Sequence, residues 1–136
     1  MIVKTLDEIK GTDREVTPKS QNWTSFRFLL KNEGMGFSFH ETKIRPGTET
    51  HIHYKNHLEA VYCVAGKGEI ETIKDGKIYP IQDGTMYALN EHDEHYLRAQ
   101  EELRLICVFN PPVSGNEVHD ADGVYSSEED HIHNYL

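Results

Sequence analysis

Histidines gather in one short stretch of the sequence, GTETHIHYKNHLEAVYCVAG at residues 47–66. Within this stretch, His51, His53 and His57 precede Glu59. Neutral imidazoles and carboxylates are common ligands of divalent transition metals, so these residue types at this density indicate metal chemistry. We therefore ask whether these histidines bind a metal, or whether the stretch keeps only the frame of a metal site whose ligands have changed.

In its spacing the stretch resembles the first motif of the cupins, a family of small double-stranded β-helix (jelly-roll) barrels. That motif has the form G-x5-H-x-H-x3,4-E-x6-G, and its histidines and glutamate bind a metal. Here Gly47, His53, Glu59 and Gly66 keep the frame, but Lys55 stands in the place of the second histidine. The resemblance therefore leaves Glu59 at a ligand position and argues against the histidines as a metal cluster.

The second motif of the cupins ends in Gly, two residues and His, and here Tyr87 follows Gly84 at that distance. Glu59 and Tyr87 would offer two oxygen ligands, and a third ligand would come from His92 or His95 in NEHDEHYL. We favour His95, because it lies in a predicted strand whereas His92 lies in the preceding turn. Two oxygens and a nitrogen suit iron(II), manganese or zinc. The alternative is that Glu59 and Tyr87 form a hydrogen-bonded pair in the core and that His95 is a buried histidine satisfied by its neighbours.

Short strands are the elements that would position these residues. Apolar and β-branched residues alternate with polar ones in segments of strand length, and Gly, Asn or Pro separates the segments. This pattern, with almost no helix, predicts an all-β antiparallel sandwich or barrel, as the motif spacing does. We expect strands over residues 23–30, 35–45, 57–65, 68–73, 77–81, 85–89, 94–99 and 103–109.

The alternation also predicts which side chains share a face of each strand. Trp23, Ser25 and Arg27 share one face, and Glu59 shares another with Cys63. These faces mix polar and apolar groups, whereas a solvent face would be more uniformly charged and a plain core less polar. A ligand cavity inside the barrel is therefore expected.

The length of 136 residues predicts one domain, which we assign to a single barrel over residues 1–125. Residues 126–136 are acidic, contain a second HIH, and are expected to form a flexible tail. The net charge of −9 and the pI near 5.4 argue against nucleic acid or a membrane surface as partner, because both attract basic patches.

Cys63 and Cys107 lie in hydrophobic runs, which is typical of buried free thiols in a reducing compartment. The sequence has no apolar run near the roughly 18 residues that span a bilayer. Its N-terminus, MIVKTLDEIK, lacks the basic and then apolar pattern of a signal peptide. These features predict a cytoplasmic protein.

Longer blocks of the sequence resemble one branch of the cupins, the ectoine synthases. The blocks are HYKNHLEAVYCVAGKGEIE, YPIQDGTMYALNEHDEHYLRA, RLICVFNPPVSGNEVHDADGVY and, near the N-terminus, GTDREV with NWTSFRFLLKNEGMGFSFHET. The resemblance extends to about Tyr125 and implies a cytoplasmic hydro-lyase that forms a head-to-tail homodimer. Such an enzyme closes N-γ-acetyl-L-2,4-diaminobutyrate into ectoine, a compatible solute of the osmotic stress response, with loss of water.

The resemblance also implies a site. The family holds iron with a glutamate, a tyrosine and a histidine, at positions that correspond here to Glu59, Tyr87 and His95. The positions that contact the substrate correspond to Trp23, Arg27, Thr42, Tyr54, Asp93, Cys107, Phe109, Glu117 and His119. His40 is a departure, because a smaller amide-type residue is expected there in some relatives.

The chemistry of the substrate suggests roles for these residues. Its α-amine is mostly protonated at neutral pH and must lose a proton before it attacks, so Glu117 and His119, with Tyr54, are the candidate catalytic groups. Arg27 would clamp the carboxylate with its planar fork. Trp23 and aromatic residues such as Phe109 would exclude water from a dehydration.

The residues themselves are also compatible with two other functions. A metal-dependent cupin of another kind, such as a dioxygenase or an isomerase, would usually show two histidines and one carboxylate. A small-molecule binding cupin without catalysis would need no metal and would explain the altered His-x-His frame. The resemblance along most of the chain favours the synthase over both.

Overall fold

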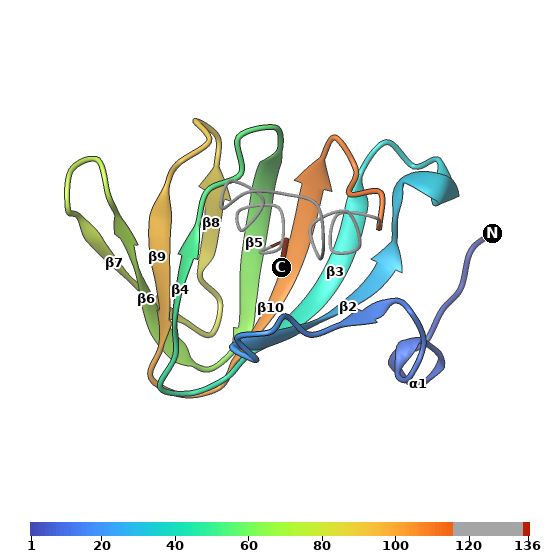
Figure 1. Ribbon diagram of the computed structural model, residues 1–136, viewed down its shortest axis with the longest axis horizontal. Helices are drawn as coiled ribbons and strands as arrows, with labels where there is room; N and C mark the ends of the chain where they lie inside the picture. Colours follow the sequence, from blue (N-terminus) through green and yellow to red (C-terminus); the bar gives the residue numbers. More distant parts are fainter. Residues whose placement is uncertain (116–134) are drawn as a thin grey trace.

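Two antiparallel sheets form the body of the molecule (Figure 1). The computed structural model describes residues 1–115 and 135–136. One sheet has six strands, in the order β1 (Glu15–Val16), β2 (Trp23–Leu29), β3 (Ser38–Ile44), β10 (Leu103–Asn110), β5 (Leu58–Ala65) and β8 (Met86–Leu89). The other has four, in the order β4 (Glu49–Ile52), β9 (His95–Ala99), β6 (Lys67–Thr72) and β7 (Ile78–Gln82).

The two sheets share one apolar core. Ile70 and Leu97 of the smaller sheet pack in the same buried cluster as Val61 and Leu105 of the larger sheet. Removal of this apolar surface from water is the main term that holds the sheets together. The expected all-β jelly-roll barrel is therefore confirmed.

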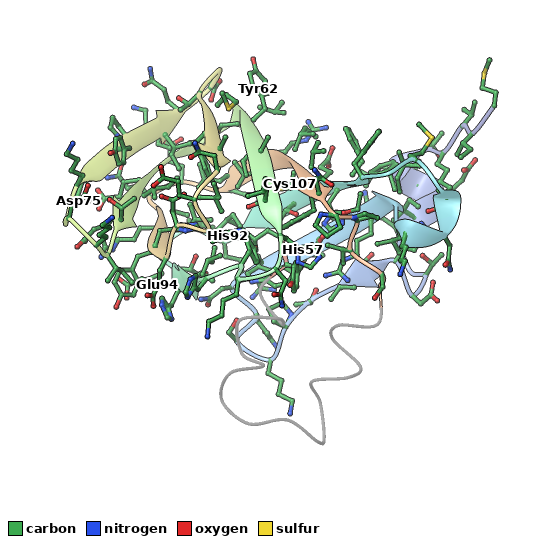
Figure 2. All side chains as sticks on the ribbon, turned by 90° about the horizontal axis from the view of Figure 1, so that it is seen from above. His57, Tyr62, Asp75, His92, Glu94 and Cys107 are labelled. Carbon is green, nitrogen blue, oxygen red and sulfur yellow. The ribbon has the colours of Figure 1, made fainter. Side chains whose placement is uncertain are left out.

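Strand β5 shows how the alternation of the sequence directs side chains. Glu59, Val61 and Cys63 are buried, whereas Leu58 and Tyr62 are exposed. Figure 2 shows Tyr62 pointing away from the body of the molecule. Because a strand has period two, a polar residue on the inner face must enter the interior together with its apolar neighbours, and Glu59 does so.

Each of the eight predicted strand segments overlaps an observed strand, with ends that differ by up to a few residues. Two further strands, β1 and β4, were not expected. Each is short, with the sequences EV and ETHI. Segments of this length show too little alternation to be recognised, and their strand geometry depends on pairing with β2 and β9.

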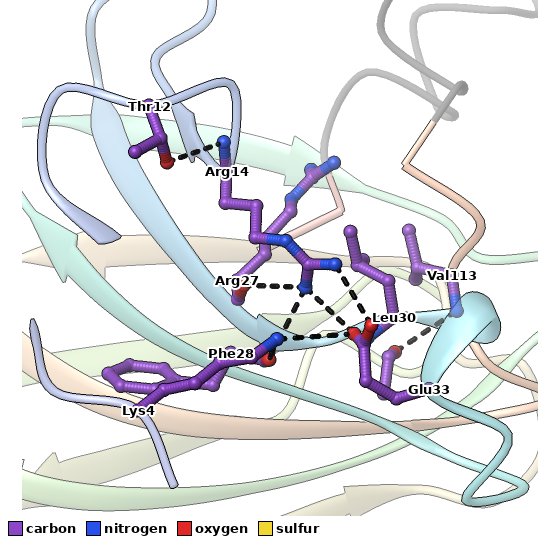
Figure 3. Close-up of polar contacts among 9 residues, drawn as sticks. Lys4, Thr12, Arg14, Arg27, Phe28, Leu30, Glu33 and Val113 are labelled. Carbon is purple, nitrogen blue, oxygen red and sulfur yellow. Dashed lines mark hydrogen bonds and ion pairs between the residues drawn. The ribbon is translucent and has the colours of Figure 1, made fainter. Parts of the chain in front are cut away.

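Helical structure is confined in the described residues to helix α1 (Leu6–Ile9) and a 3-10 turn (Lys31–Glu33). Thr5 is the N-cap of helix α1 and forms a capping box with Glu8. The carboxylate of Glu33 accepts hydrogen bonds from Arg14 at 2.8 and 3.0 Å and from the backbone N–H of Leu30 at 2.7 Å (Figure 3). This contact ties the N-terminal segment to the end of β2.

The last two residues of the sequence, Tyr135 and Leu136, are buried against the barrel. The predicted domain boundary near residue 125 and the rest of the predicted tail lie outside the described residues, so the proposed division stays a prediction. For Tyr135 and Leu136 themselves, the buried position differs from the expectation of a free tail. Among the described helices, none is long and apolar enough to cross a membrane.

Candidate metal centre and substrate cavity

Glu59 and Tyr87 lie on neighbouring strands of the larger sheet. Val61 of β5 pairs directly with Tyr87 of β8. Glu59 lies two residues before Val61 on the same inner face and is therefore a diagonal neighbour of Tyr87. His95 begins β9 of the other sheet, and its ring centroid lies 6.4 Å from that of Tyr87. The predicted ligands thus come from both sheets to one place in the interior.

Each of these three residues has one buried polar atom without a hydrogen-bond partner in the described part of the chain. The atoms are Oε2 of Glu59, the hydroxyl of Tyr87 and Nε2 of His95. Buried polar groups are almost always satisfied, so three unsatisfied atoms in one place need a common explanation. The alternative of a hydrogen-bonded pair between Glu59 and Tyr87 does not fit, because neither of these atoms has such a bond.

His95 is oriented by its other ring nitrogen. Nδ1 lies 2.8 Å from the carbonyl oxygen of Asp93, and a carbonyl can only accept a hydrogen bond. Nδ1 therefore carries the proton, which leaves Nε2 with a lone pair directed to the interior. Burial lowers the pKa of His95, against an opposing effect of this hydrogen bond, so the ring stays neutral as a metal ligand must.

The two oxygen ligands are in the opposite situation. Burial raises the pKa of Glu59 from its ordinary value of 4.5 to about 8, although Cys107 partly opposes the shift. Burial and the charge of Glu59 also raise the pKa of the Tyr87 hydroxyl. A divalent cation would reverse both effects by stabilising the anionic forms. The residues fit a metal ion of the iron(II), manganese or zinc type, which prefers such mixed oxygen and nitrogen ligands.

A second group of buried side chains surrounds the interior on the side of β2, β3 and β10. The group contains most of the residues predicted to contact the substrate. All of them are buried: Trp23, Thr42, Cys107 and Phe109 completely, and Arg27 and Tyr54 to 1% exposure. The rings of Tyr54 and Phe109 meet edge to face at a centroid distance of 5.1 Å. Burial raises the pKa of the Cys107 thiol, which therefore packs as a neutral group.

This second group supplies hydrogen-bond donors and an aromatic wall around the buried residues Tyr135 and Leu136. We call the interior space that these two residues fill the cavity. The guanidinium of Arg27 and the hydroxyl of Thr42 both donate hydrogen bonds to buried backbone carbonyls. The side chain of Cys107 connects the two groups, because its thiol lies near both Thr42 and Glu59. A ligand with an anionic end and a polar end would be held between the donors and the candidate metal centre.

A family model described as "Ectoine synthase" matches residues 1–129 of the chain. The chain belongs to the ectoine synthase family. The L-ectoine synthase of Wolinella succinogenes is 64% identical over 125 residues, which cover 92% of this chain and 95% of that protein. The L-ectoine synthase of Sporosarcina pasteurii is 68% identical over 126 residues, which cover 92% of each chain.

Solved structures agree with these relatives. The crystal structure of an ectoine synthase from P. lautus is 56% identical, covers 92% of this chain and 88% of that one, and superimposes with a TM-score of 0.84. Members of the ectoine synthase family are hydro-lyases, so this chain is an enzyme of that class.

Other residues predicted for an ectoine synthase site are placed differently or lie beyond the described residues. The carboxylate of Asp93 accepts a hydrogen bond from the backbone N–H of Glu91 at 3.2 Å, while its carbonyl orients His95. Glu117 and His119 lie outside the described residues, so their roles stay predictions.

The histidines of residues 47–66, and His92, have surroundings that differ from those of the proposed metal ligands. His51 lies 2.6 Å from the Glu94 carboxylate near the surface, and Lys55 is exposed in the loop before β5. His92 sits in a turn with φ of 54°, its Nδ1 near backbone carbonyls rather than beside Tyr87. In the described structure His95, and not His92, lies beside Tyr87.

Sequence reasoning did not include Ser25 and His57 among the site residues. Ser25 is fully buried on the cavity face of β2, and the ring of His57 meets that of Phe109 edge to face at 6.1 Å. The shared face of Trp23, Ser25 and Arg27 was a usable signal for Ser25. No local signal distinguishes His57 from the other histidines of its stretch.

Proposed function

We propose that this chain closes N-γ-acetyl-L-2,4-diaminobutyrate into ectoine with loss of water, with an iron(II) ion bound by Glu59, Tyr87 and His95. The observation that carries the metal part is the set of three buried, unsatisfied atoms on these residues in the described structure. Manganese or zinc would be chemically acceptable substitutes. Membership of the ectoine synthase family supports the reaction.

In the proposed reaction the α-amine of the substrate attacks the carbonyl carbon of its own acetamide. A carbon–nitrogen bond forms, the carbonyl oxygen leaves as water, and a cyclic amidine remains. When bound, the metal supplies a Lewis acid that polarises the acetamide oxygen. The protein must hold the folded substrate so that nitrogen and carbon touch, because an intramolecular reaction gains mainly from orientation.

The residues around the cavity supply this orientation. We assign the substrate carboxylate to Arg27, whose planar fork can donate a hydrogen bond to each carboxylate oxygen, with help from Thr42. Trp23 and Phe109 form a dry wall, which matters because water would reverse a dehydration. We assign proton transfer to Glu117 and His119, with Tyr54 assisting, on the strength of the family resemblance alone. Asp93 and Cys107 complete the predicted substrate contacts.

An anaerobic assay tests this proposal. Metal-free protein would receive iron(II) and N-γ-acetyl-L-2,4-diaminobutyrate, and ectoine would be followed by NMR. We expect product that depends on iron and is lost in Tyr87→Phe, which removes only one hydroxyl. The matched control is Tyr62→Phe, since Tyr62 is exposed on the outer face of β5. Tightly bound iron without product would favour another cupin chemistry, and neither iron nor product would favour a binding module.

We also propose a head-to-tail homodimer. Strand β8 is an edge of the larger sheet, and its residue Met86 is 60% exposed beside an apolar groove of about 420 Å³ between β7 and β8. Ile2 and Val3 are exposed at the other end of the chain. Within the described residues no strand pairs with the outer edge of β8. Such an edge beside an apolar groove is a template for another strand, so we assign the groove to Met1–Val3 of a second copy.

We place the enzyme in the cytoplasm, where ectoine would accumulate as a compatible solute under osmotic stress. Both cysteines are free and buried, which suits a reducing compartment. The acidic composition does not favour nucleic acid or membrane surfaces as partners.

A further inference from the structure

Leu136 lies fully buried inside the barrel, and its backbone is bonded to the cavity. Its carbonyl oxygen accepts a hydrogen bond from Ser25 Oγ at 2.8 Å and another from the hydroxyl of Thr42. Its N–H donates to the hydroxyl of Tyr54 at 3.1 Å. The polar backbone atoms of this residue are thus satisfied by side chains of the cavity, as a bound ligand would be.

Tyr135 makes a second set of contacts with the same cavity. Arg27 Nη2 donates to its carbonyl oxygen at 3.0 Å, and its hydroxyl lies 2.9 Å from Nδ1 of His57. Its ring stacks on Tyr54 at a centroid distance of 4.9 Å and lies 5.5 Å from the ring of Phe109. The aromatic wall and the guanidinium are therefore engaged by the chain itself.

These contacts use the groups assigned to the substrate. Arg27, Thr42, Tyr54 and Phe109 each belong to the predicted substrate-binding or catalytic set, and each touches Tyr135 or Leu136. The carbonyl of Leu136 takes hydrogen bonds that a substrate carboxylate or amide oxygen would take. A buried donor cannot serve two acceptors in the same place, so the dipeptide and the substrate exclude each other.

We propose that Tyr135–Leu136 is an internal competitive ligand of the substrate cavity, which must leave before substrate binds. The inference rests on the proposed function for the identity of the substrate. The family model ends at residue 129, so this dipeptide lies beyond the part of the chain that defines the family. The apparent KM equals the intrinsic KM divided by the fraction of molecules whose cavity is open, because only those molecules accept substrate.

Steady-state kinetics on the metal-loaded full chain and on a variant that lacks residues 135–136 would test this. We expect KM to fall about tenfold on deletion while kcat stays unchanged, the pattern of a removed competitor. Tyr135→Phe keeps the ring and the backbone bonds but loses the contact with His57, so its KM should fall by a smaller factor. Tyr62→Phe serves as the matched control, with KM unchanged.

Amide hydrogen exchange gives a readout that needs no turnover. In the full chain we expect slow exchange at the Leu136 N–H, because it is buried and bonded to Tyr54, and faster exchange when ectoine saturates the protein. Free exchange of that amide without ligand, or an unchanged or higher KM after deletion, would overturn the inference and leave the proposed function intact. Absence of ectoine from every variant would refute the proposed function, and hydrogen exchange alone would then decide the occupancy.

Discussion

Glu59 is the residue on which the metal proposal depends most, since among the three proposed ligands it alone keeps the residue type of a cupin motif position. Glu59→Gln keeps the size of the side chain but replaces a carboxylate with a neutral amide, a much weaker ligand. We expect iron content after dialysis to fall to roughly a tenth or less of the parent value, together with activity. Elemental analysis by mass spectrometry measures the iron directly.

The matched control at this scale is Lys55→Ala. Lys55 occupies the place of a cupin metal histidine in the sequence but is exposed in the structure. Its replacement should leave the iron content intact. Full iron in Glu59→Gln would remove Glu59 from the ligand set, and loss of iron in Lys55→Ala would mean that the first motif has been misread.

Arg27 is the proposed ligand of the substrate carboxylate. Its buried guanidinium is assigned to the substrate carboxylate, and a charge-assisted hydrogen bond contributes about 1.5–3 kcal/mol. Arg27→Ala should therefore raise KM by roughly 10- to 100-fold, with a smaller effect on kcat. Arg45→Ala, at an exposed arginine, is the control. An unchanged KM in Arg27→Ala would count against the carboxylate clamp.

The turn between β5 and β6 passes close to the backbone of Glu102 at Gly66, and this close approach can be tested. Gly66 has φ of 112°, and a Cβ there would overlap the carbonyl oxygen of Glu102. Gly66→Ala should lower the free energy of unfolding by more than about 2 kcal/mol, through strain and steric overlap together. Gly76 also has a positive φ, of 66°, but open space around it, so Gly76→Ala should cost only about 1 kcal/mol. Chemical denaturation compares the two, and equal costs would contradict the close approach.

The contact of Glu33 with Arg14 predicts how the N-terminal elements respond to pH. Hydrogen bonds from Arg14 lower the pKa of Glu33 from its ordinary value of 4.5 to about 2. A carboxyl group whose pKa is lower in the folded than in the unfolded protein stabilises the fold at pH values above its unfolded pKa. This contribution is lost as the pH falls from about 4.5 towards 2.

Glu33→Gln should therefore lower the free energy of unfolding by about 1–2 kcal/mol at pH 7 and flatten its decline below pH 4.5. Denaturation curves at several pH values give this comparison. Glu101→Gln, at an exposed glutamate, is the control and should keep the parent profile. The same pH dependence in Glu33→Gln and in the parent would show that this ion pair does not set it.

At the scale of the whole molecule, the homodimer predicts a change of mass. Ile2→Lys places a charge where the proposed contact with strand β8 of the second copy is apolar. We expect the dissociation constant of the dimer to rise at least about tenfold, roughly 1.4 kcal/mol, as measured by sedimentation. Met35→Lys changes another exposed apolar residue, in the loop before β3, and should leave the dimer unchanged. A parent protein that sediments as a monomer would refute the assembly.

Features that depend on local period and spacing can be predicted from the sequence. Alternation along β5 places Glu59 on the inner face, because successive side chains of a strand must point to opposite sides. The replacement of the motif histidines by Lys55 and Tyr87 is likewise readable without coordinates. The short strands β1 and β4 escaped detection, since their geometry comes from their partners rather than from their own residues.

Contacts between residues from different strands and loops follow only from the three-dimensional fold. The carbonyl of Asp93 selects the free nitrogen of His95, and the pairing of β5 with β8 brings Glu59 beside Tyr87. Ser25 and Leu136 lie 111 positions apart in the sequence, yet they share a hydrogen bond in the cavity. Local periodicity specifies only the direction in which a side chain points. What it meets depends on how both sheets close around one core, and that is a property of all the long-range contacts together.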